Sequence, residues 1–208
     1  NTHYADLTDT SSLRNIIQEV KPDEFYNLGA MSHVGVSFYT AESVLNINSL
    51  GAYRVLDILK EIAPRCRYYQ ASSSEMVGAS PPPQNEKTTF LPQSPYGISK
   101  VAAYHTTKYF RNANKMFCSN GILFNHESPR RGLNFVTRKI TFNVAKIIAG
   151  KEKKIYLGNV DTRRDWGFAG DYVKAMWMIL QHDKPDDFAI STGENRSIKE
   201  FLETVFSI

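Results

Sequence analysis

The chain has 208 residues, of which 42% are hydrophobic and 22% charged, and this composition predicts a globular protein with a sizeable core. Its net charge of +4 could indicate a nucleic-acid partner, but the basic residues are scattered apart from the pairs Arg130/Arg131 and Arg163/Arg164. We therefore expect no nucleic acid and assign the Arg pairs to a phosphate-bearing small molecule. No apolar run approaches the roughly 18 residues of a membrane span, so we expect no membrane segment.

Cysteine usage predicts neither a metal site nor a disulfide framework. The only two cysteines, Cys66 and Cys118, lie in no CxxC or Cys/His arrangement. Cys118 falls in an apolar stretch and is expected to be a buried small hydrophobe. We therefore expect a reducing, cytoplasmic setting.

The first half of the chain alternates between helical and extended patterns. Apolar residues at helical spacing over 13–20 predict a helix that ends before Pro22. A short buried strand is expected at 24–28, a long helix over about 41–62, and a second strand at 67–72.

The same alternation continues in the second half. A helix is expected to begin near Ser94, with proline in its first turn, and is followed by a strand over 120–125 and a helix over 135–149. Ser197 and Glu200 have the spacing of a capping box at the start of a last helix. That helix is expected to bury four apolar side chains: Ile198, Phe201, Leu202 and Val205.

This alternation predicts an α/β fold, a doubly wound parallel sheet built from βαβ units. Ligands of such sheets bind at the carboxyl ends of the strands. Three segments with candidate functional residues follow predicted strand ends: 28–30, 72–75 and 125–131.

A Tyr and a Lys four residues apart, Tyr96 and Lys100, are the first candidate catalytic pair. On a helix they share one face, and a nearby ammonium stabilises a phenolate, which makes the Tyr a usable base. The spacing alone is weak, because such pairs also occur on solvated helices. The hydroxyl-rich stretch QASSSE at 70–75, which could be a simple strand end, strengthens the catalytic interpretation of the Tyr–Lys pair. Together the two motifs favour a catalytic function for Ser73 and Glu75 as well.

Several longer stretches carry a family resemblance. A strand, serines and then YxxxK is the order of the catalytic set in short-chain dehydrogenases/reductases. The matching stretches are 26–34 (YNLGAMSHV), 69–75 (YQASSSE), 120–132 (NGILFNHESPRRG), 134–140 (NFVTRKI), 157–159 (LGN) and 163–167 (RRDWG). Over essentially the whole chain, the sequence resembles the GDP-mannose 4,6-dehydratase family of extended short-chain dehydrogenases/reductases.

The resemblance implies a Rossmann-like sheet, incomplete at its N-terminus, with a smaller C-terminal part. Residues 1–130 would form the cofactor-binding part and residues 131–208 mainly the substrate-binding part. The family has a Gly-rich loop, but no GxxGxxG motif precedes the first strand of this chain. We therefore expect a fragment that lacks the N-terminal Gly-rich βαβ unit and the C-terminal end.

The resemblance also assigns site residues. The catalytic set would be Ser73, Glu75, Tyr96 and Lys100. The cofactor-binding set would be Asp6, Leu7, Leu28, Gly29, Ala30, Ser32, Tyr96, Lys100, His126 and Arg131. The substrate-binding set would be Asn125, Asn134, Lys139, Gly158, Arg163 and Arg164. The family usually has Thr in place of Ser73 and an aromatic residue in place of Val77.

The implied reaction converts GDP-mannose to GDP-4-keto-6-deoxymannose, with NADP as cofactor, in GDP-deoxysugar synthesis. Tyr96 would take the proton of the sugar 4-hydroxyl, Ser73 would hydrogen-bond the same oxygen, and Glu75 would take the C5 proton. A homo-oligomer, a dimer or tetramer, is expected.

Alternative interpretations remain open at this point. The chain could be a non-catalytic remnant that only associates with intact subunits, or another nucleotide-sugar epimerase, dehydratase or decarboxylase. Glu75 argues against an epimerase, because that reaction needs no second base there. His126 could be a structural histidine, and Asn134 could be a helix cap.

Overall fold

The computed structural model describes all 208 residues and divides them into two compact units. The first contains residues 1–123 and 174–190, and the second contains residues 124–173 and 191–208. The contacts therefore divide the chain at Leu123, and residues 174–190 return to the first unit. The cofactor and substrate roles expected for 1–130 and 131–208 stay predictions.

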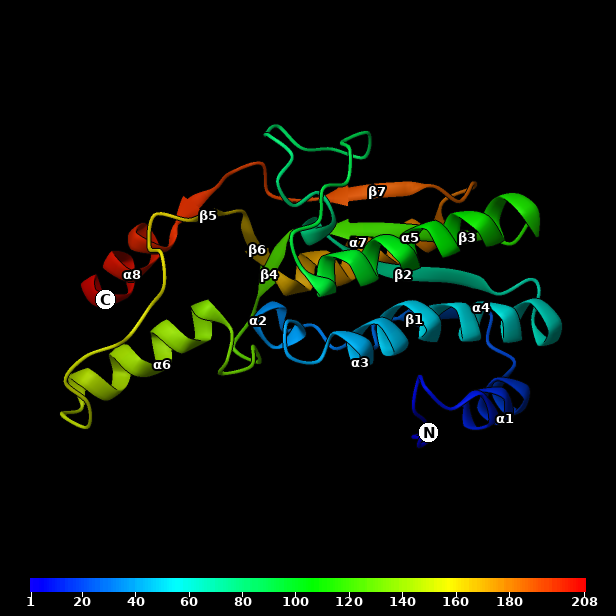
Figure 1. The fold of residues 1–208 in the computed structure, drawn as a ribbon, viewed down its shortest axis with the longest axis horizontal. Helices are drawn as coiled ribbons and strands as arrows, with labels where there is room; N and C mark the ends of the chain where they lie inside the picture. Colours follow the sequence, from blue (N-terminus) through cyan, green and yellow to red (C-terminus); the bar gives the residue numbers. More distant parts are fainter. The chain divides into compact units, whose positions relative to one another are not determined.

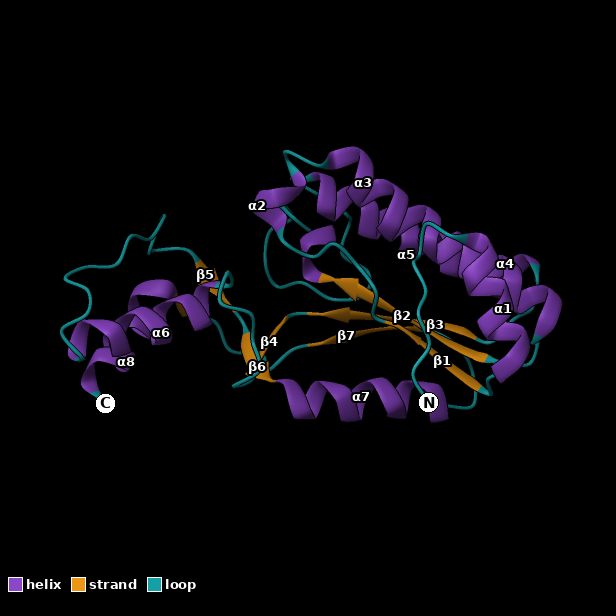
Figure 2. Ribbon diagram, turned by 90° about the horizontal axis from the view of Figure 1, so that it is seen from below, coloured by secondary structure: helices purple, strands orange, loops and turns teal.

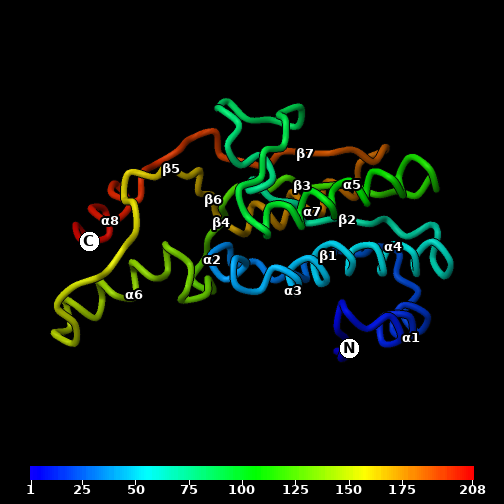
Figure 3. Tube along the Cα trace, viewed as in Figure 1, coloured from blue at the N-terminus to red at the C-terminus, as the bar shows by residue number.

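A four-stranded parallel sheet forms the centre of the first unit, in the order β1-β2-β3-β7. Its strands are β1 (Glu24–Asn27), β2 (Arg67–Ser73), β3 (Cys118–Leu123) and β7 (Asp187–Ile190). The trace shows β7 lying alongside β3 although a long segment separates them in sequence (Figure 3). The three predicted strands are confirmed, but the third ends at Leu123 instead of residue 125.

Helices cover both faces of this sheet, which confirms the doubly wound α/β class (Figure 2). On one face lie α3 (Ala41–Leu45), α4 (Gly51–Ile62) and α5 (Pro95–Ala113), and on the other lies α7 (Ala169–Gln181). A π-helical turn, η1 (Asn46–Leu50), joins α3 to α4, so the predicted helix over 41–62 is confirmed. Two further helices of this unit are α1 (Thr10–Val20) and α2 (Val34–Ser37). Figure 1 gives the order of these elements along the chain.

The main core of the first unit lies between the sheet and the helices on one side of it. Leu56 and Leu59 of α4, Tyr68 of β2 and Phe110 of α5 are almost completely buried there. Cys118 belongs to the same core, as predicted. Burial raises the pKa of its thiol to about 12, so the thiol stays neutral and unreactive.

The second unit has two small sheets and two helices. Strand β4 (Asn125–Glu127) pairs in parallel with β6 (Trp166–Phe168), and β5 (Arg163–Arg164) pairs with the antiparallel β8 (Arg196–Ser197). The helices are α6 (Val136–Ile148) and α8 (Ile198–Ser207). No helix of the chain combines the length and apolar character that crossing a membrane requires.

Helix α8 confirms one prediction and corrects another. Ser197 Oγ accepts a hydrogen bond from the Glu200 amide at 3.0 Å, and the Glu200 carboxylate accepts one from the Ser197 amide. The predicted capping box is therefore present. The predicted burial is wrong, because none of the α8 residues is buried and one side of the helix borders an open groove. The four apolar side chains concerned are only half-buried: Ile198, Phe201, Leu202 and Val205.

Candidate functional site

The turn after β2 carries two of the predicted catalytic residues. Ser73, the last residue of β2, is the N-cap of the short 3-10 helix η2 (Ser74–Met76), and its hydroxyl accepts a hydrogen bond from the Glu75 amide at 3.2 Å. Met76 is fully buried and anchors this turn. Ser73 and Glu75 remain partly exposed, so both side chains are accessible to a ligand.

The start of α5 carries the other two. Ser94 caps the helix by accepting a hydrogen bond from the Gly97 amide at 3.0 Å, and Pro95 occupies the first turn. Tyr96 and Lys100 are buried one turn apart, and the Lys100 ammonium lies 5.8 Å from the Tyr96 ring centroid. The prediction that Tyr96 and Lys100 share one face of a helix is therefore confirmed, while their catalytic roles stay predictions.

Lys100 reaches back to the strand that carries Ser73. Its Nζ donates a hydrogen bond to the Ala71 carbonyl at 2.8 Å. Only 4% of the residue is exposed. Burial lowers the pKa of Lys100 to about 8, because the charged ammonium loses its hydration. A cation with a pKa near neutrality can hold or release a proton beside Tyr96.

This pKa predicts how stability depends on pH. Folded Lys100 releases its proton near pH 8 and unfolded Lys100 near pH 10.5, so between these values the unfolded state binds more protons. The contribution of Lys100 to the free energy of unfolding must therefore rise with pH over this range. At one pKa unit per 1.36 kcal/mol, the full rise is roughly 3 kcal/mol. Denaturant unfolding from pH 7 to 10 should show this rise in the difference between wild type and Lys100→Met. A pH-independent difference would contradict the burial of the charge.

Gly97 brings the turn after β2 and the start of α5 together. A Cβ at this position would lie 2.7 Å from the Glu75 carbonyl oxygen and 3.0 Å from Pro92 Cβ. Only a residue without a side chain allows this approach. The contact places the Ser73–Glu75 turn against the helix turn that presents Tyr96 and Lys100.

Gly97→Ala should therefore push the turn and the helix apart. Overpacking against a backbone atom costs about 1–3 kcal/mol and outweighs the roughly 1 kcal/mol that alanine gains inside a helix. We expect a lower free energy of unfolding, measured by urea denaturation. A stability gain of about 1 kcal/mol would show that the turn does not contact the helix.

The loop after β1 contains four of the predicted cofactor residues: Leu28, Gly29, Ala30 and Ser32. Leu28 is 55% exposed. A Cβ on Gly29 would lie 2.8 Å from Leu7 Cδ1, and the Leu7 carbonyl accepts a hydrogen bond from Arg54 at 3.0 Å. Leu7 is thus held beside the loop. Asp6 Oδ1 accepts hydrogen bonds of 2.7 Å from the Thr8 amide and hydroxyl, and these lower its pKa.

Asn48 is a residue of this region that sequence reasoning missed. It lies in the π-helical turn, is 3% exposed, and forms hydrogen bonds with both the amide and the carbonyl of Met31, at 2.9 and 3.1 Å. Its Nδ2 also donates to Ser99 Oγ on α5 at 2.9 Å. Asn48 therefore links the loop after β1 to the helix with Tyr96 and Lys100. A polar residue at an apolar position of the 41–62 pattern was the available signal.

In the second unit, His126 and Arg131 are held by neighbouring side chains. The His126 ring stacks on Tyr172 with centroids 4.7 Å apart, and its Nδ1 lies 2.8 Å from the Phe124 carbonyl. A carbonyl only accepts, so Nδ1 carries the proton in this contact. Arg131 pairs with Glu127 at 3.1 Å and covers the Phe135 ring.

The predicted substrate-binding residues all lie in the second unit. Arg163 donates to Asn195 and lies 3.5 Å from Glu200, while Arg164 donates to the Arg163 carbonyl. Both Arg side chains are exposed, as are Asn134 and Gly158, and Asn125 and Lys139 are half-buried. The helix-cap interpretation of Asn134 is wrong, because α6 has Phe135 at its N-cap. The recognition roles of all six stay predictions.

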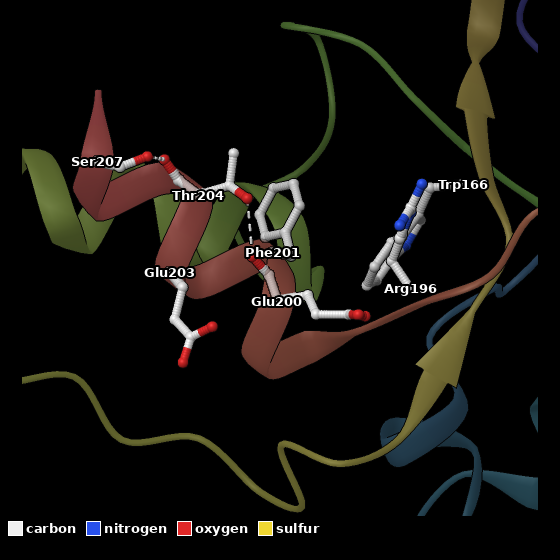
Figure 4. Close-up of a pocket in the computed structure, with 7 residues that line it drawn as sticks. All are labelled: Trp166, Arg196, Glu200, Phe201, Glu203, Thr204 and Ser207. Atoms are coloured by element: carbon white, nitrogen blue, oxygen red, sulfur yellow. Dashed lines mark hydrogen bonds between the residues drawn. The ribbon is translucent and has the colours of Figure 1, made fainter.

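A groove of about 690 Å³ also lies in the second unit. It is lined by Trp166, Arg196, Glu200, Phe201, Glu203, Thr204 and Ser207. Figure 4 shows Trp166 and Arg196 on one side and the α8 residues on the other. None of the predicted site residues lines this groove, so it gives no support to the predicted substrate set.

The parallel sheet, with a buried Tyr96–Lys100 pair packed against the Ser73–Glu75 turn, defines a Rossmann-type protein of the short-chain dehydrogenase/reductase class. The family model described as GDP-mannose 4,6 dehydratase matches residues 1–208. The chain belongs to the GDP-mannose 4,6-dehydratase family.

Individual relatives agree with this assignment. The chain is 53% identical to GDP-mannose 4,6 dehydratase 2 of Arabidopsis thaliana and to the Homo sapiens GDP-mannose 4,6 dehydratase, over 98% of its length and 56% of theirs. The structure of RMD from Pseudomonas aeruginosa complexed with NADPH superposes with a TM-score of 0.90 at 25% identity, covering 97% of this chain and 69% of that one. The chain spans about half the length of the curated relatives it matches.

Proposed function

We propose that the chain carries the catalytic and substrate-binding residues of a GDP-mannose 4,6-dehydratase, a lyase that removes water from the sugar. The observation that carries the proposal is the close contact between Gly97 and the Glu75 carbonyl. It gathers a phenol base, its cation, a hydroxyl and one carboxylate at the carboxyl edge of one parallel sheet. The family membership and the names of the relatives support GDP-mannose as substrate.

Each of the four residues has a distinct role in the proposal. Tyr96 takes the proton of the sugar 4-hydroxyl, and Lys100 stabilises its phenolate. Ser73 donates a hydrogen bond to the same sugar oxygen. Once the 4-position is a ketone, the C5 hydrogen is acidic. Glu75 removes this proton and passes it to O6, which leaves as water as the C5–C6 double bond forms. Holding these groups in one geometry adds to the rate, because the reacting atoms are already oriented.

NADP is the proposed cofactor, and the first unit fits a dinucleotide. The loop at Leu28–Ala30 follows a parallel strand, lacks bulk at Gly29 and is held by Asn48 and Leu7. Lys100 lies beside the neighbouring strand. When bound, NADP supplies the hydride acceptor and donor of the internal redox chemistry. The NADPH complex of the RMD relative supports NADP over NAD.

The GDP-sugar is assigned to residues of the second unit. Arg163 and Arg164 present exposed guanidinium groups, which suit the oxygens of a diphosphate. Asn125, Asn134, Lys139 and Gly158 complete the proposed substrate set. His126 and Arg131 complete the proposed cofactor set.

The proposal is tested by incubating the protein with NADP+ and GDP-mannose and following the sugar nucleotide by mass spectrometry. A product lighter by one water is expected from a dehydratase. A product of unchanged mass with inverted stereochemistry would indicate an epimerase and contradict the proposal. No conversion of any GDP-sugar would favour the non-catalytic alternative.

We also propose a cytoplasmic homo-oligomer. The free, buried cysteines suit a reducing compartment. Helices α4 and α5 pack side by side. Their outer surface carries Tyr53 of α4 and Ile98 and Tyr109 of α5, and Leu50 of η1 directly precedes α4; these four apolar residues are 45–54% exposed. Two copies of this surface facing each other across a two-fold axis would bury these side chains.

The double variant Tyr53→Glu/Tyr109→Glu should therefore dissociate the assembly, because two like charges per subunit would be buried in the interface. Sedimentation velocity should show a smaller species than wild type. Ile148→Glu, at a 73% exposed residue of the second unit, is the control and should keep the wild-type species. An unchanged species for the double variant would contradict this surface as the interface.

A further inference from the structure

A buried carboxylate, Asp187, is the first residue of β7, lies in register with Asn120 of β3 and is not used by the proposed chemistry. Its side chain is 8% exposed and pairs with Arg111 of α5, whose side chain is 11% exposed. Tyr104 of α5 donates a hydrogen bond to it at 2.6 Å, and Asn120 of β3 donates another at 2.9 Å. One carboxylate thus joins the edge strand β7, the neighbouring strand and helix α5.

The contacts of Asp187 fall on the helix face that also presents the catalytic pair. Lys100 and Tyr104 are four residues apart, and Arg111 lies two turns further along the same face. Because Tyr104 and Arg111 bind the same carboxylate, α5 can neither slide along the sheet nor rotate without breaking a charged hydrogen bond. The position of Tyr96 and Lys100 at the other end of the helix follows from this attachment.

The same network reaches the strand that carries Ser73. Ser72 Oγ donates to Asn120 Oδ1 at 3.1 Å, and both residues are buried. Asn120 Nδ2 in turn donates to Asp187. The Tyr104 ring belongs to the buried cluster that contains Met76, the anchor of the Glu75 turn. Both halves of the proposed catalytic set are therefore attached to Asp187.

The charge of the Asp187 carboxylate supports a lasting attachment of α5 to the sheet. Burial alone would raise the pKa of Asp187, but hydrogen bonds from Arg111, Tyr104 and Asn120 outweigh it and hold the pKa below its usual value. The carboxylate is ionised at neutral pH and accepts all three bonds. Lys108, 3.4 Å away, adds a further positive charge.

We propose that Asp187 is a positioning residue that sets α5, and with it Tyr96 and Lys100, in register with the Ser73–Glu75 turn. The inference rests on the function proposed above, because only a reaction shared by these four residues requires that register. Asp187 itself touches no reacting atom in this account.

The test compares Asp187→Asn and Tyr104→Phe with Tyr69→Phe, below the melting temperature of each variant. Asn keeps the shape of Asp187 but loses its charge, and Tyr104→Phe removes only the hydroxyl. A displacement of about 1 Å can reduce turnover by about 100-fold, so we expect kcat to fall by up to about 100-fold for Asp187→Asn and about 10-fold for Tyr104→Phe, with KM unchanged. Tyr69→Phe is the matched control, since its buried hydroxyl has no hydrogen-bond partner.

Hydrogen exchange supplies a readout that does not depend on activity. Amides of residues 94–101, which lie at least three residues before Tyr104, should exchange faster in Asp187→Asn and not in Tyr69→Phe. Lower melting temperatures with unchanged kcat and unchanged exchange at 94–101 would overturn the proposal and leave Asp187 a stabilising residue only. If wild type shows no turnover, the proposed function fails, and exchange at 94–101 alone decides the role of Asp187.

Discussion

Tyr96→Phe should reduce GDP-mannose turnover by roughly 10²–10⁴-fold, the range that general acid–base catalysis contributes. The substitution removes only the phenolic oxygen, which is the proposed acceptor of the 4-hydroxyl proton. Tyr96 is 8% exposed and belongs to the buried core at the start of α5, so phenylalanine should keep the fold. Steady-state assays should show a loss in kcat with little change in KM, because the hydroxyl acts in the transition state.

Tyr69→Phe provides the control for this substitution. Tyr69 is also a buried tyrosine, lies on β2 close to the site, and its hydroxyl has no hydrogen-bond partner. Wild-type kcat is expected for Tyr69→Phe. If Tyr96→Phe also kept wild-type kcat, another group would have to be the base, and the assigned role of Tyr96 would be wrong.

Glu75→Gln should separate the first chemical step from the elimination. The amide cannot accept the C5 proton, whereas Tyr96, Lys100 and Ser73 remain in place for oxidation at C4. We expect the water-loss product to decrease by roughly 10²–10⁴-fold and one equivalent of reduced cofactor per site to accumulate. Stopped-flow absorbance and product mass spectrometry would measure the two quantities on the same sample.

Glu42→Gln, at an exposed carboxylate of α3, is the matched control and should turn over like wild type. Full turnover by Glu75→Gln would remove the elimination role of Glu75. Loss of both the reduced cofactor signal and the product would instead show that Glu75 is needed for binding or for the first step.

The elements that the sequence predicted are those with strong local signals. Ser94 before Pro95 marked the start of α5, and Ser197 with Glu200 marked α8. The Tyr96–Lys100 pair could be predicted for the same reason, because a four-residue spacing fixes two side chains on one helix face. In each case the interacting residues are only three or four positions apart in the sequence.

The parts that could not be predicted depend on residues far apart in sequence. The contact of Gly97 with the Glu75 carbonyl requires the packing of α5 on the turn after β2. The pairing of Asn120 with Asp187 requires β7 to return beside β3. The break at Phe124 follows from the division into two units, which no local pattern encodes.

The most direct test of the central claim uses GDP-mannose labelled with deuterium at C4 of the sugar. If the four residues catalyse an internal oxidation, elimination and reduction, the product should be lighter by one water and should carry the deuterium at C6, as NMR of the new methyl group would show. A product that keeps its water, or one that has lost water without deuterium at C6, would contradict the account.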